Sequence, residues 1–432
     1  MERKLLKQLE RWKNKKNRKP LIIQGARQVG KTWIMKEFGL RFFKDTVYIN
    51  FDNNEIMKKV FELDFDIKRI ITEISIEYGK KVTAKDTLII FDEIQEAPKA
   101  LSSLKYFYEN APEYTIVAAG SLLGVALHSG TSFPVGKVDF MHLYPLDFSE
   151  FLCDIGKEQL AELIEADDYE MVNVNAPKYK ELLKKYLYIG GMPEVVQSYI
   201  DNNDYVEIRD IQKNLLKYYE EDFSKHAPKE VIPRIMMVWN SIPSQLAKEN
   251  RKFIYGLIRT GARAKDFELA IQWLEDAGLI IRSYRIKKPD IPLVAYMEMN
   301  SFKMFMLDVG LLTAKANISA KVLLEDSRIF EEFKGALTEQ FVAQQLNASD
   351  RELYYYSTEN SSGEIDFVIQ QDMHCIPIEV KANENLRAKS LQAYCKKYNP
   401  EIAIRTSLSN YREQDWLLNI PLYMLDKYIE KI

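Results

Sequence analysis

Short apolar runs alternate with amphipathic stretches over roughly the first third of the 432-residue chain. The runs are rich in Val, Ile, Leu, Phe and Ala, as is typical of strands that are buried on both faces of a parallel sheet. The stretches between them have the helical period, beginning with the one that starts at Trp33. This alternation predicts an α/β fold with a doubly wound parallel sheet. We expect its strands at residues 21–23, 46–52, 87–91, 115–119 and 138–143.

Beyond the sheet the pattern is helical from residue 148 to about 224, with a break at Gly190, Gly191 and Pro193. Such a break suits either a hinge between a core and its helical lid or an ordinary turn between helices. Three further helical stretches and a hairpin-like pair of runs follow within residues 231–313. This order predicts a winged helix, with residues 264–277 as the recognition helix.

Basic residues surround the predicted recognition helix and hairpin. They could contact DNA phosphates, or the region could serve only for protein packing, since nearby acids weaken the local field. The cations are Arg259, Arg263, Lys265, Arg282, Arg285, Lys287 and Lys288.

The sequence GARQVGKT, residues 25–32, lies between the first predicted strand and the helix that follows it. Strand, glycine-rich loop and helix in this order indicate a phosphate-binding loop, whose glycines let backbone N–H groups approach polyphosphate. Lys31 supplies a charge for the β- and γ-phosphates, Thr32 supplies a hydroxyl for Mg²⁺, and the helix dipole favours the same anion. The predicted nucleotide-binding residues are Gly25, Ala26, Arg27, Gln28, Val29, Gly30, Lys31, Thr32 and Trp33.

Two adjacent acids, Asp92 and Glu93, follow the predicted strand 87–91. At the end of a strand beside a phosphate loop, Asp92 can complete the Mg²⁺ shell and Glu93 can polarise the attacking water. The run 115–119 leads into Gly120 and Ser121. Because the carboxyl ends of parallel strands meet at one edge of the sheet, Ser121 is the candidate sensor of the γ-phosphate.

A second set of charged residues occupies the last hundred or so positions. Glu339 lies in a helical pattern, Asp366 on a strand, and Glu379 and Lys381 on one face of a further strand. A hairpin between the two strands would bring Asp366 near Glu379. Carboxylates that hold Mg²⁺ or Mn²⁺, with a lysine that orients water, suit phosphodiester cleavage. The alternative is that Glu379 and Lys381 form a surface ion pair.

Charge and cysteine content restrict the partners and the compartment. The 60 basic and 63 acidic residues leave a net charge of −3, so no global field attracts nucleic acid. Cys153, Cys375 and Cys395 lack the spacing of a zinc site or a disulfide framework, which fits a reducing cytoplasm. No apolar run is long enough to span a bilayer, so we expect a cytoplasmic protein without a membrane partner.

Taken together, these motifs resemble prokaryotic AAA+ ATPases that carry a C-terminal domain with a restriction-endonuclease-like, PD-(D/E)xK fold. The resemblance implies an ASCE-type core with Asp92 on the metal and Glu93 as the catalytic base. It also implies that Asp366, Glu379 and Lys381 form the nuclease motif, with Glu339 as the acid on the helix. Similar proteins often carry an arginine where this chain has Lys137, and lysine lacks the planar fork that binds phosphate bidentately. The segments that carry the resemblance are GARQVGKT (25–32), IIFDEIQ (89–95), AAGSLLG (118–124), LYPLDFSEF (143–151), YLYIGGMPEVV (186–196) and FKMFMLDVGLL (302–312).

We therefore expect a Mg²⁺-dependent ATPase coupled to a DNA-associated, nuclease-like module. The alternative is a nucleotide-switched regulator that binds DNA or protein and whose nuclease-like domain does not cut; a small-molecule kinase is a more remote reading. Association with a protein partner or with further copies of the chain is left open. The expected domains are an ATPase core at 1–150, a helical lid at 151–228, a winged-helix-like region at 229–320 and the nuclease-like domain at 321–432.

Overall fold

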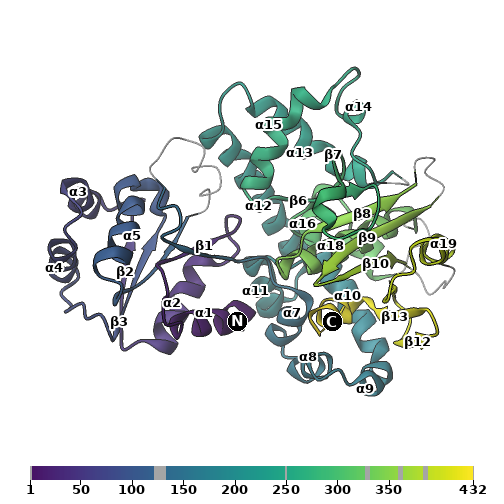
Figure 1. The fold of residues 1–432 in the computed structure, drawn as a ribbon, viewed down its shortest axis with the longest axis horizontal. Coiled ribbons are helices and arrows are strands. Elements are labelled where there is room, and N and C mark those ends of the chain that lie inside the picture. Colours follow the sequence, from purple (N-terminus) through teal and green to yellow (C-terminus); the bar gives the residue numbers. More distant parts are fainter. Residues whose placement is uncertain are drawn as a thin grey trace. The chain divides into compact units, whose positions relative to one another are not determined.

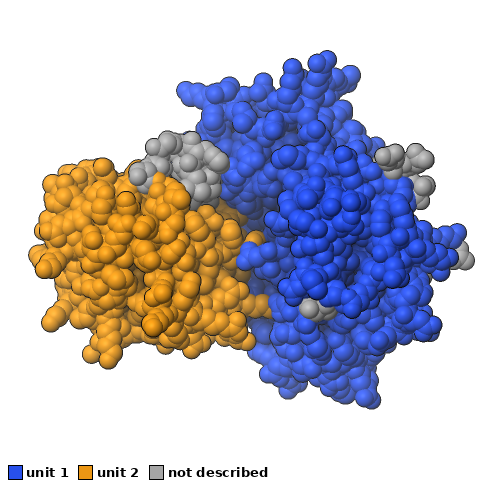
Figure 2. Space-filling view, viewed as in Figure 1, with its two compact units in different colours: residues 1, 145–432 blue, residues 2–144 orange. Residues whose placement is uncertain are grey.

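The computed structural model of the chain describes residues 2–120, 133–248, 251–325, 331–358, 363–382 and 388–431. The chain divides into two compact units, residues 2–144 and residues 145–432, which Figure 2 colours separately. None of the helices in these described ranges combines the length and the apolarity needed to cross a bilayer.

The first unit is built on a five-stranded sheet in the order β2-β3-β4-β1-β5, in which every pair is parallel. This confirms the predicted parallel α/β sheet. Leu88, Ile89, Ile90 and Phe91 of β3 are fully buried, because helices cover a strand of this kind on both faces. The strands are β1 (Leu21–Gln24), β2 (Asp45–Asn50), β3 (Thr87–Asp92), β4 (Thr115–Ala119) and β5 (Asp139–His142).

Local signals start and end the helices of this unit. The Asp66 carboxylate accepts hydrogen bonds from the N–H groups of Lys68 and Arg69 at the start of α4, and Gly79 ends that helix with a φ of 60°. The apolar face of α1 is buried through Leu5, Leu6, Leu9 and Trp12. The helices are α1 (Lys4–Lys13), α2 (Lys31–Phe42), α3 (Glu55–Leu63), α4 (Ile67–Tyr78) and α5 (Pro98–Asn110), with a short 3₁₀ turn at Ile94–Glu96.

Three buried aromatic rings anchor the functional end of β3. Phe51, Phe61 and Phe91 meet edge to face, with centroid separations of 5.4–5.6 Å. Such pairs stabilise a core beyond the area they bury. Since Phe91 precedes Asp92, this cluster holds in place the strand end that carries the acid.

The second unit begins with helices, as the sequence predicted. Asp147 starts the first of them through a reciprocal capping box with Glu150. The elements are α7 (Phe148–Asp154), α8 (Glu158–Glu165), α9 (Tyr169–Val174), α10 (Ala176–Ile189), α11 (Pro193–Asn202), α12 (Tyr205–His226), α13 (Ile232–Leu246), α14 (Tyr255–Ile258) and α15 (Ala264–Asp276).

The same unit contains a mixed eight-stranded sheet in the order β12-β13-β11-β10-β9-β8-β6-β7. Helix α18 packs on β6, β7, β8 and β10, and α19 packs on β9 and β10. The strands are β6 (Ile280–Ile286), β7 (Met297–Met306), β8 (Leu353–Ser357), β9 (Glu364–Gln371), β10 (His374–Val380), β11 (Ile404–Ser407), β12 (Arg412–Gln414) and β13 (Leu417–Pro421). The remaining helices are α16 (Val309–Lys315), α17 (Ala320–Leu324), α18 (Glu331–Ala348), α19 (Lys389–Tyr398) and α20 (Leu425–Lys431).

The predicted wing is part of this sheet. Strands β6 and β7 pair antiparallel, and β6 also pairs in parallel with β8. The hairpin therefore continues the C-terminal sheet, and residue 320, where we expected a domain boundary, lies inside one compact unit.

Candidate nucleotide site and carboxylate cluster

The phosphate loop joins β1 to α2, as predicted. Gly30 precedes the helix with a φ of 98°, a conformation that strongly favours glycine. Gly25 has a φ of 146°, and a Cβ atom there would lie 2.2 Å from the carbonyl oxygen of Leu143. Glycine is thus required at position 25 by the close approach of the chain after β5, in addition to any role at phosphate.

The ammonium of Lys31 is bound by its own loop. Its Nζ donates hydrogen bonds to the carbonyl oxygens of Gly25 at 2.8 Å and Ala26 at 2.7 Å. Burial lowers the pKa of Lys31 to about 8, while the nearby charges of Glu93 and Asp92 act in the opposite direction. Two carbonyls therefore stabilise the cation at the place where a phosphate is expected to bind.

Asp92 accepts hydrogen bonds from two hydroxyl groups on the same carboxylate oxygen. Thr32 Oγ1 lies 2.6 Å and the Tyr48 hydroxyl 2.8 Å from Asp92 Oδ2. Asp92 is only 3% exposed, so these bonds fix the direction of its carboxylate. Tyr48 was not predicted as a site residue. The only indication of its role was that it lies on β2, in which Asn50 pairs with Asp92 of β3.

Glu93 is held in an unusual backbone conformation. Its φ of 50° is left-handed, which is uncommon for a residue with a side chain and is found at functional sites. The Gln95 side-chain amide donates to Glu93 Oε2 at 2.6 Å. Gln95 was also missed, although it stands only two positions beyond the predicted base.

Two further predicted features concern the edges of this site. Ser121, the candidate sensor, lies outside the described residues, and it directly follows Gly120 at the end of β4. Lys137 Nζ pairs with Glu109 Oε1 at 3.0 Å. Lys137, which stands where an arginine was expected, therefore forms an ion pair within its own unit.

Buried Arg3 supports the phosphate loop from outside. Its guanidinium donates to the carbonyl oxygen of Val29 at 3.3 Å and to that of Tyr144 at 2.6 Å. These bonds connect the loop to the segment after β5. The sequence offered no signal for this role, because Arg3 is distant from the loop along the chain.

The predicted C-terminal residues do come together. The β9–β10 hairpin pairs Phe367 with Ile378, which places Asp366 opposite Glu379 one step further on. Asp366 Oδ2 accepts the N–H of Val380 at 2.8 Å, and Lys381 Nζ pairs with Glu379 Oε1 at 2.9 Å. This brings Asp366, Glu379 and Lys381 to one end of the hairpin.

The structure adds three residues to this carboxylate cluster. Lys303 of β7 is fully buried, with its Nζ 2.5 Å from Glu364 Oε1, 3.4 Å from Glu339 Oε2 and 3.8 Å from Asp366 Oδ1. Arg251 forms an ion pair with Glu339. Burial and, to a smaller extent, the charge of Asp366 raise the pKa of Glu339 to about 7, although Lys303 and Arg251 act in the opposite direction. Within the described ranges, no three His, Cys, Asp or Glu side chains are arranged to hold a metal ion.

Several of the cations expected to contact DNA have acidic neighbours. Arg282 pairs with Glu275, and Lys288 Nζ lies 2.6 Å from Asp290 Oδ2. Arg285 pairs with Glu298 at 2.8 Å. Internal ion pairs reduce the charge that these side chains offer to phosphate.

Sequence comparison finds a known family over the segment that contains the first of these sites. The AAA domain family matches residues 17–152. This segment is similar to AAA domains, which carry a P-loop. The match covers the phosphate loop, the acids at the end of β3 and the whole of the parallel sheet. Two families described as domains of unknown function match residues 180–322 (DUF8612) and 334–425 (DUF4143). No curated protein matches the chain significantly.

Solved structures give weaker likenesses to the chain as a whole. A Walker-type ATPase of Pyrococcus abyssi is 16% identical, with 72% of this chain and 94% of that chain covered and a TM-score of 0.45. The ORC1 protein of Aeropyrum pernix, solved in complex with DNA, is 12% identical over 73% of this chain and 90% of its own, with a TM-score of 0.25. Cdc6p of Pyrobaculum aerophilum is 12% identical over 74% and 93%, with a TM-score of 0.23. Scores this low carry no argument about function, so the P-loop assignment rests on the AAA domain match and the site geometry.

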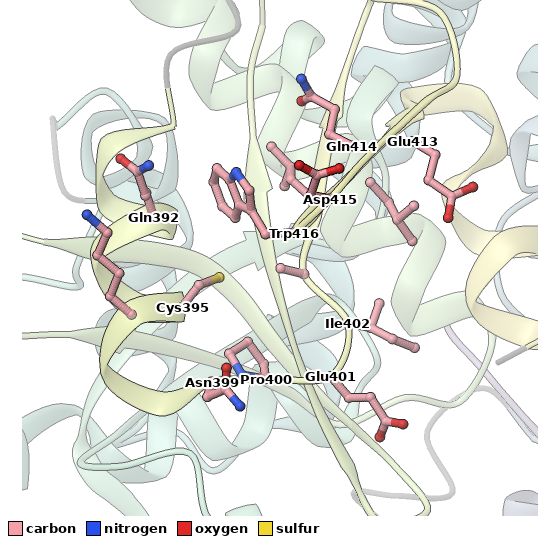
Figure 3. Close-up of a pocket in the computed structure, with 14 residues that line it drawn as sticks. Gln392, Cys395, Asn399, Pro400, Glu401, Ile402, Glu413, Gln414, Asp415 and Trp416 are labelled. Atoms are coloured by element: carbon pink, nitrogen blue, oxygen red, sulfur yellow. The ribbon is translucent and has the colours of Figure 1, made fainter.

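The C-terminal sheet also borders a hollow away from the carboxylate cluster. It lies between α19 and the turn from β12 to β13 (Figure 3). Its volume is about 580 Å³. Trp416, which is 41% exposed, stands in its wall. None of the carboxylates of the cluster lines it.

Proposed function

We propose that this chain binds ATP and hydrolyses it with Mg²⁺, and that the reaction drives or switches the C-terminal module. The observation that carries the proposal is the 2.6 Å contact between Thr32 Oγ1 and Asp92 Oδ2, directly beside the phosphate-loop lysine. A hydroxyl and a carboxylate from two different elements meet where a hard cation with oxygen ligands would bind. Thr32 and Asp92 therefore fit Mg²⁺, which would neutralise charge on the β- and γ-phosphates.

Each remaining residue has a distinct task in this proposal. Lys31 replaces its hydrogen bonds to two loop carbonyls with hydrogen bonds to phosphate oxygens. The triphosphate therefore binds to an ammonium group that is already in position. Glu93 accepts the proton of the attacking water. Gln95 orients the Glu93 carboxylate through its amide, and Tyr48 orients Asp92. These two are positioning residues, because each acts through an acid.

Replacing Glu93 tests the proposal. We expect Glu93→Gln to retain ATP binding and to lower the rate of phosphate release by about 100-fold or more, as for loss of a general base. Glu96→Gln is the matched control, since Glu96 is exposed and only three positions away. Unchanged turnover in Glu93→Gln would overturn the proposed chemistry.

A second candidate function is a nucleotide-switched binding protein whose C-terminal module does not cut nucleic acid. The observation that favours it is the buried ammonium of Lys303 among the carboxylates that were expected to hold a metal. The two candidates share the ATP site and differ in what the C-terminal acids do. Incubation of supercoiled and single-stranded DNA with Mg²⁺ or Mn²⁺ separates them: cleavage by the wild type that Asp366→Ala abolishes would reject the second.

A further inference from the structure

Four carboxylates and one lysine, from three strands of the C-terminal sheet and one helix packed on it, form the carboxylate cluster. Glu364 and Asp366 belong to β9, Glu379 to β10 and Glu339 to α18, while Lys303 enters from β7. Lys303 is 0%, Glu339 3% and Glu379 4% exposed. Charges this far from water must be compensated locally, because burying an unpaired ion is strongly unfavourable.

Lys303 supplies most of that compensation. Its ammonium has carboxylate oxygens of Glu364, Glu339 and Asp366 within 4 Å. The side chain also passes the Tyr355 ring, with Nζ 5.2 Å from the centroid. A cation surrounded on several sides by acids from separate elements occupies the position that a bound metal ion would take.

We propose that Lys303 is a built-in cation that replaces the metal in this cluster and keeps Mg²⁺ and Mn²⁺ out. A divalent ion needs several carboxylate oxygens to converge on an empty point about 2.0–2.6 Å away, and here these oxygens converge on an ammonium group. A metal ion beside Lys303 would also meet its positive charge at short range. The residues present therefore do not fit the metal that the nuclease-like motif implies.

The other charged side chains are consistent with this assignment. Arg251 neutralises Glu339 from a second direction, and Lys381 neutralises Glu379. Glu379 Oε2 is the buried carboxylate oxygen of the cluster that has no hydrogen-bond partner within the described ranges. Because Lys381 already pairs with Oε1 of the same carboxylate, the negative charge of Glu379 is compensated without a metal.

The cluster then acts as a structural element of the sheet. Lys303 connects edge strand β7 to β9 and to α18, elements that are distant in sequence. This inference concerns only the C-terminal site, so it stands or falls independently of ATP hydrolysis by the P-loop domain.

Mn²⁺ binding to the full-length chain without nucleotide tests the proposal. Free Mn²⁺ is measured by electron paramagnetic resonance for the wild type, Asp366→Asn, Lys303→Met and Lys303→Met/Asp366→Asn. We expect the wild type and Asp366→Asn to bind equal amounts. Lys303→Met should gain one Mn²⁺ ion per chain, and the double variant should lose it. Lys381→Met removes a more exposed lysine beside the same cluster and should gain none.

A stability measurement covers the case in which Lys303→Met folds poorly. Removing one partner of a buried ion pair is expected to lower Tm by roughly 5–15 °C in EDTA. Mn²⁺ should restore most of this loss in Lys303→Met and leave the wild type unchanged. A wild-type Mn²⁺ ion that Asp366→Asn lacks would overturn the proposal, as would a folded Lys303→Met that gains no ion.

Discussion

The carboxylate of Asp308 accepts a hydrogen bond of 2.7 Å from the backbone N–H of Gly191, 117 positions earlier in the chain. Asp308 is completely buried, and its other oxygen accepts the N–H of Leu311 at the start of α16. A Cβ atom at Gly190 would lie 2.2 Å from Asp308 Oδ1. The glycine break that suited either a hinge or a turn is thus a corner packed tightly against a buried carboxylate.

Replacing Asp308 should destabilise the second unit. Asp308→Ala leaves two buried N–H groups without an acceptor, and we expect a loss of about 2–5 kcal/mol in the free energy of unfolding. Urea denaturation followed by circular dichroism measures the change. Asp210→Ala, at an exposed position of α12, should shift the stability by less than about 0.5 kcal/mol. Equal effects of the two substitutions would contradict the structural role of Asp308.

Removing the Tyr48 hydroxyl should weaken Mg²⁺-dependent catalysis and leave the fold intact. Tyr48→Phe deletes one of two hydrogen bonds to Asp92 Oδ2. Hydrogen bonds to charged groups contribute about 1.5–3 kcal/mol, so kcat should fall by roughly 10- to 100-fold and a higher Mg²⁺ concentration should be needed. Steady-state phosphate release across a Mg²⁺ titration measures both. Tyr106→Phe serves as the control, and an unchanged Mg²⁺ requirement in Tyr48→Phe would argue against this role.

The Gln95 amide is expected to affect the chemical step rather than ATP binding. Gln95→Leu keeps a side chain of similar volume but cannot donate to Glu93 Oε2. We expect kcat to fall by about 10-fold or more, while the dissociation constant of ATP changes little. A rise in the dissociation constant of ATP as large as the fall in kcat would point to a merely structural role.

The pKa of Lys31 predicts a proton uptake on ATP binding. Burial lowers this pKa to about 8 in the free protein, and bound phosphate should raise it again. At pH values between the pKa of Lys31 in the free protein and its higher pKa in the complex, the complex holds more protons than free protein and free ATP together. ATP affinity should therefore fall as the pH rises above about 8. Calorimetric titrations at pH 9 in two buffers of different ionisation enthalpy measure the uptake. Identical heats in both buffers would show that Lys31 is already charged.

Local sequence patterns predicted several elements of the fold. The strands of the first sheet and the β9–β10 hairpin depend on periodicity and turns, which are properties of neighbours in the chain. The partners of the site residues were harder to predict. Tyr48 reaches Asp92 across 44 positions, and Lys303 reaches Glu339 across 36. Nothing in a strand's own pattern reveals which polar side chain on a neighbouring element will face it.

By itself, the sequence determined that a glycine loop, a lysine and two acids would meet at the carboxyl edge of a parallel sheet, and that three acids and a lysine would gather near the C-terminus. These conclusions follow from short-range rules of strand, loop and hairpin. Only the tertiary structure decided which cation neutralises the acids near the C-terminus. The side chain of Lys303 reaches these acids although β6 and β8 separate β7 from β9 in the sheet. A buried carboxylate must be paired with whatever cation the tertiary packing brings to it.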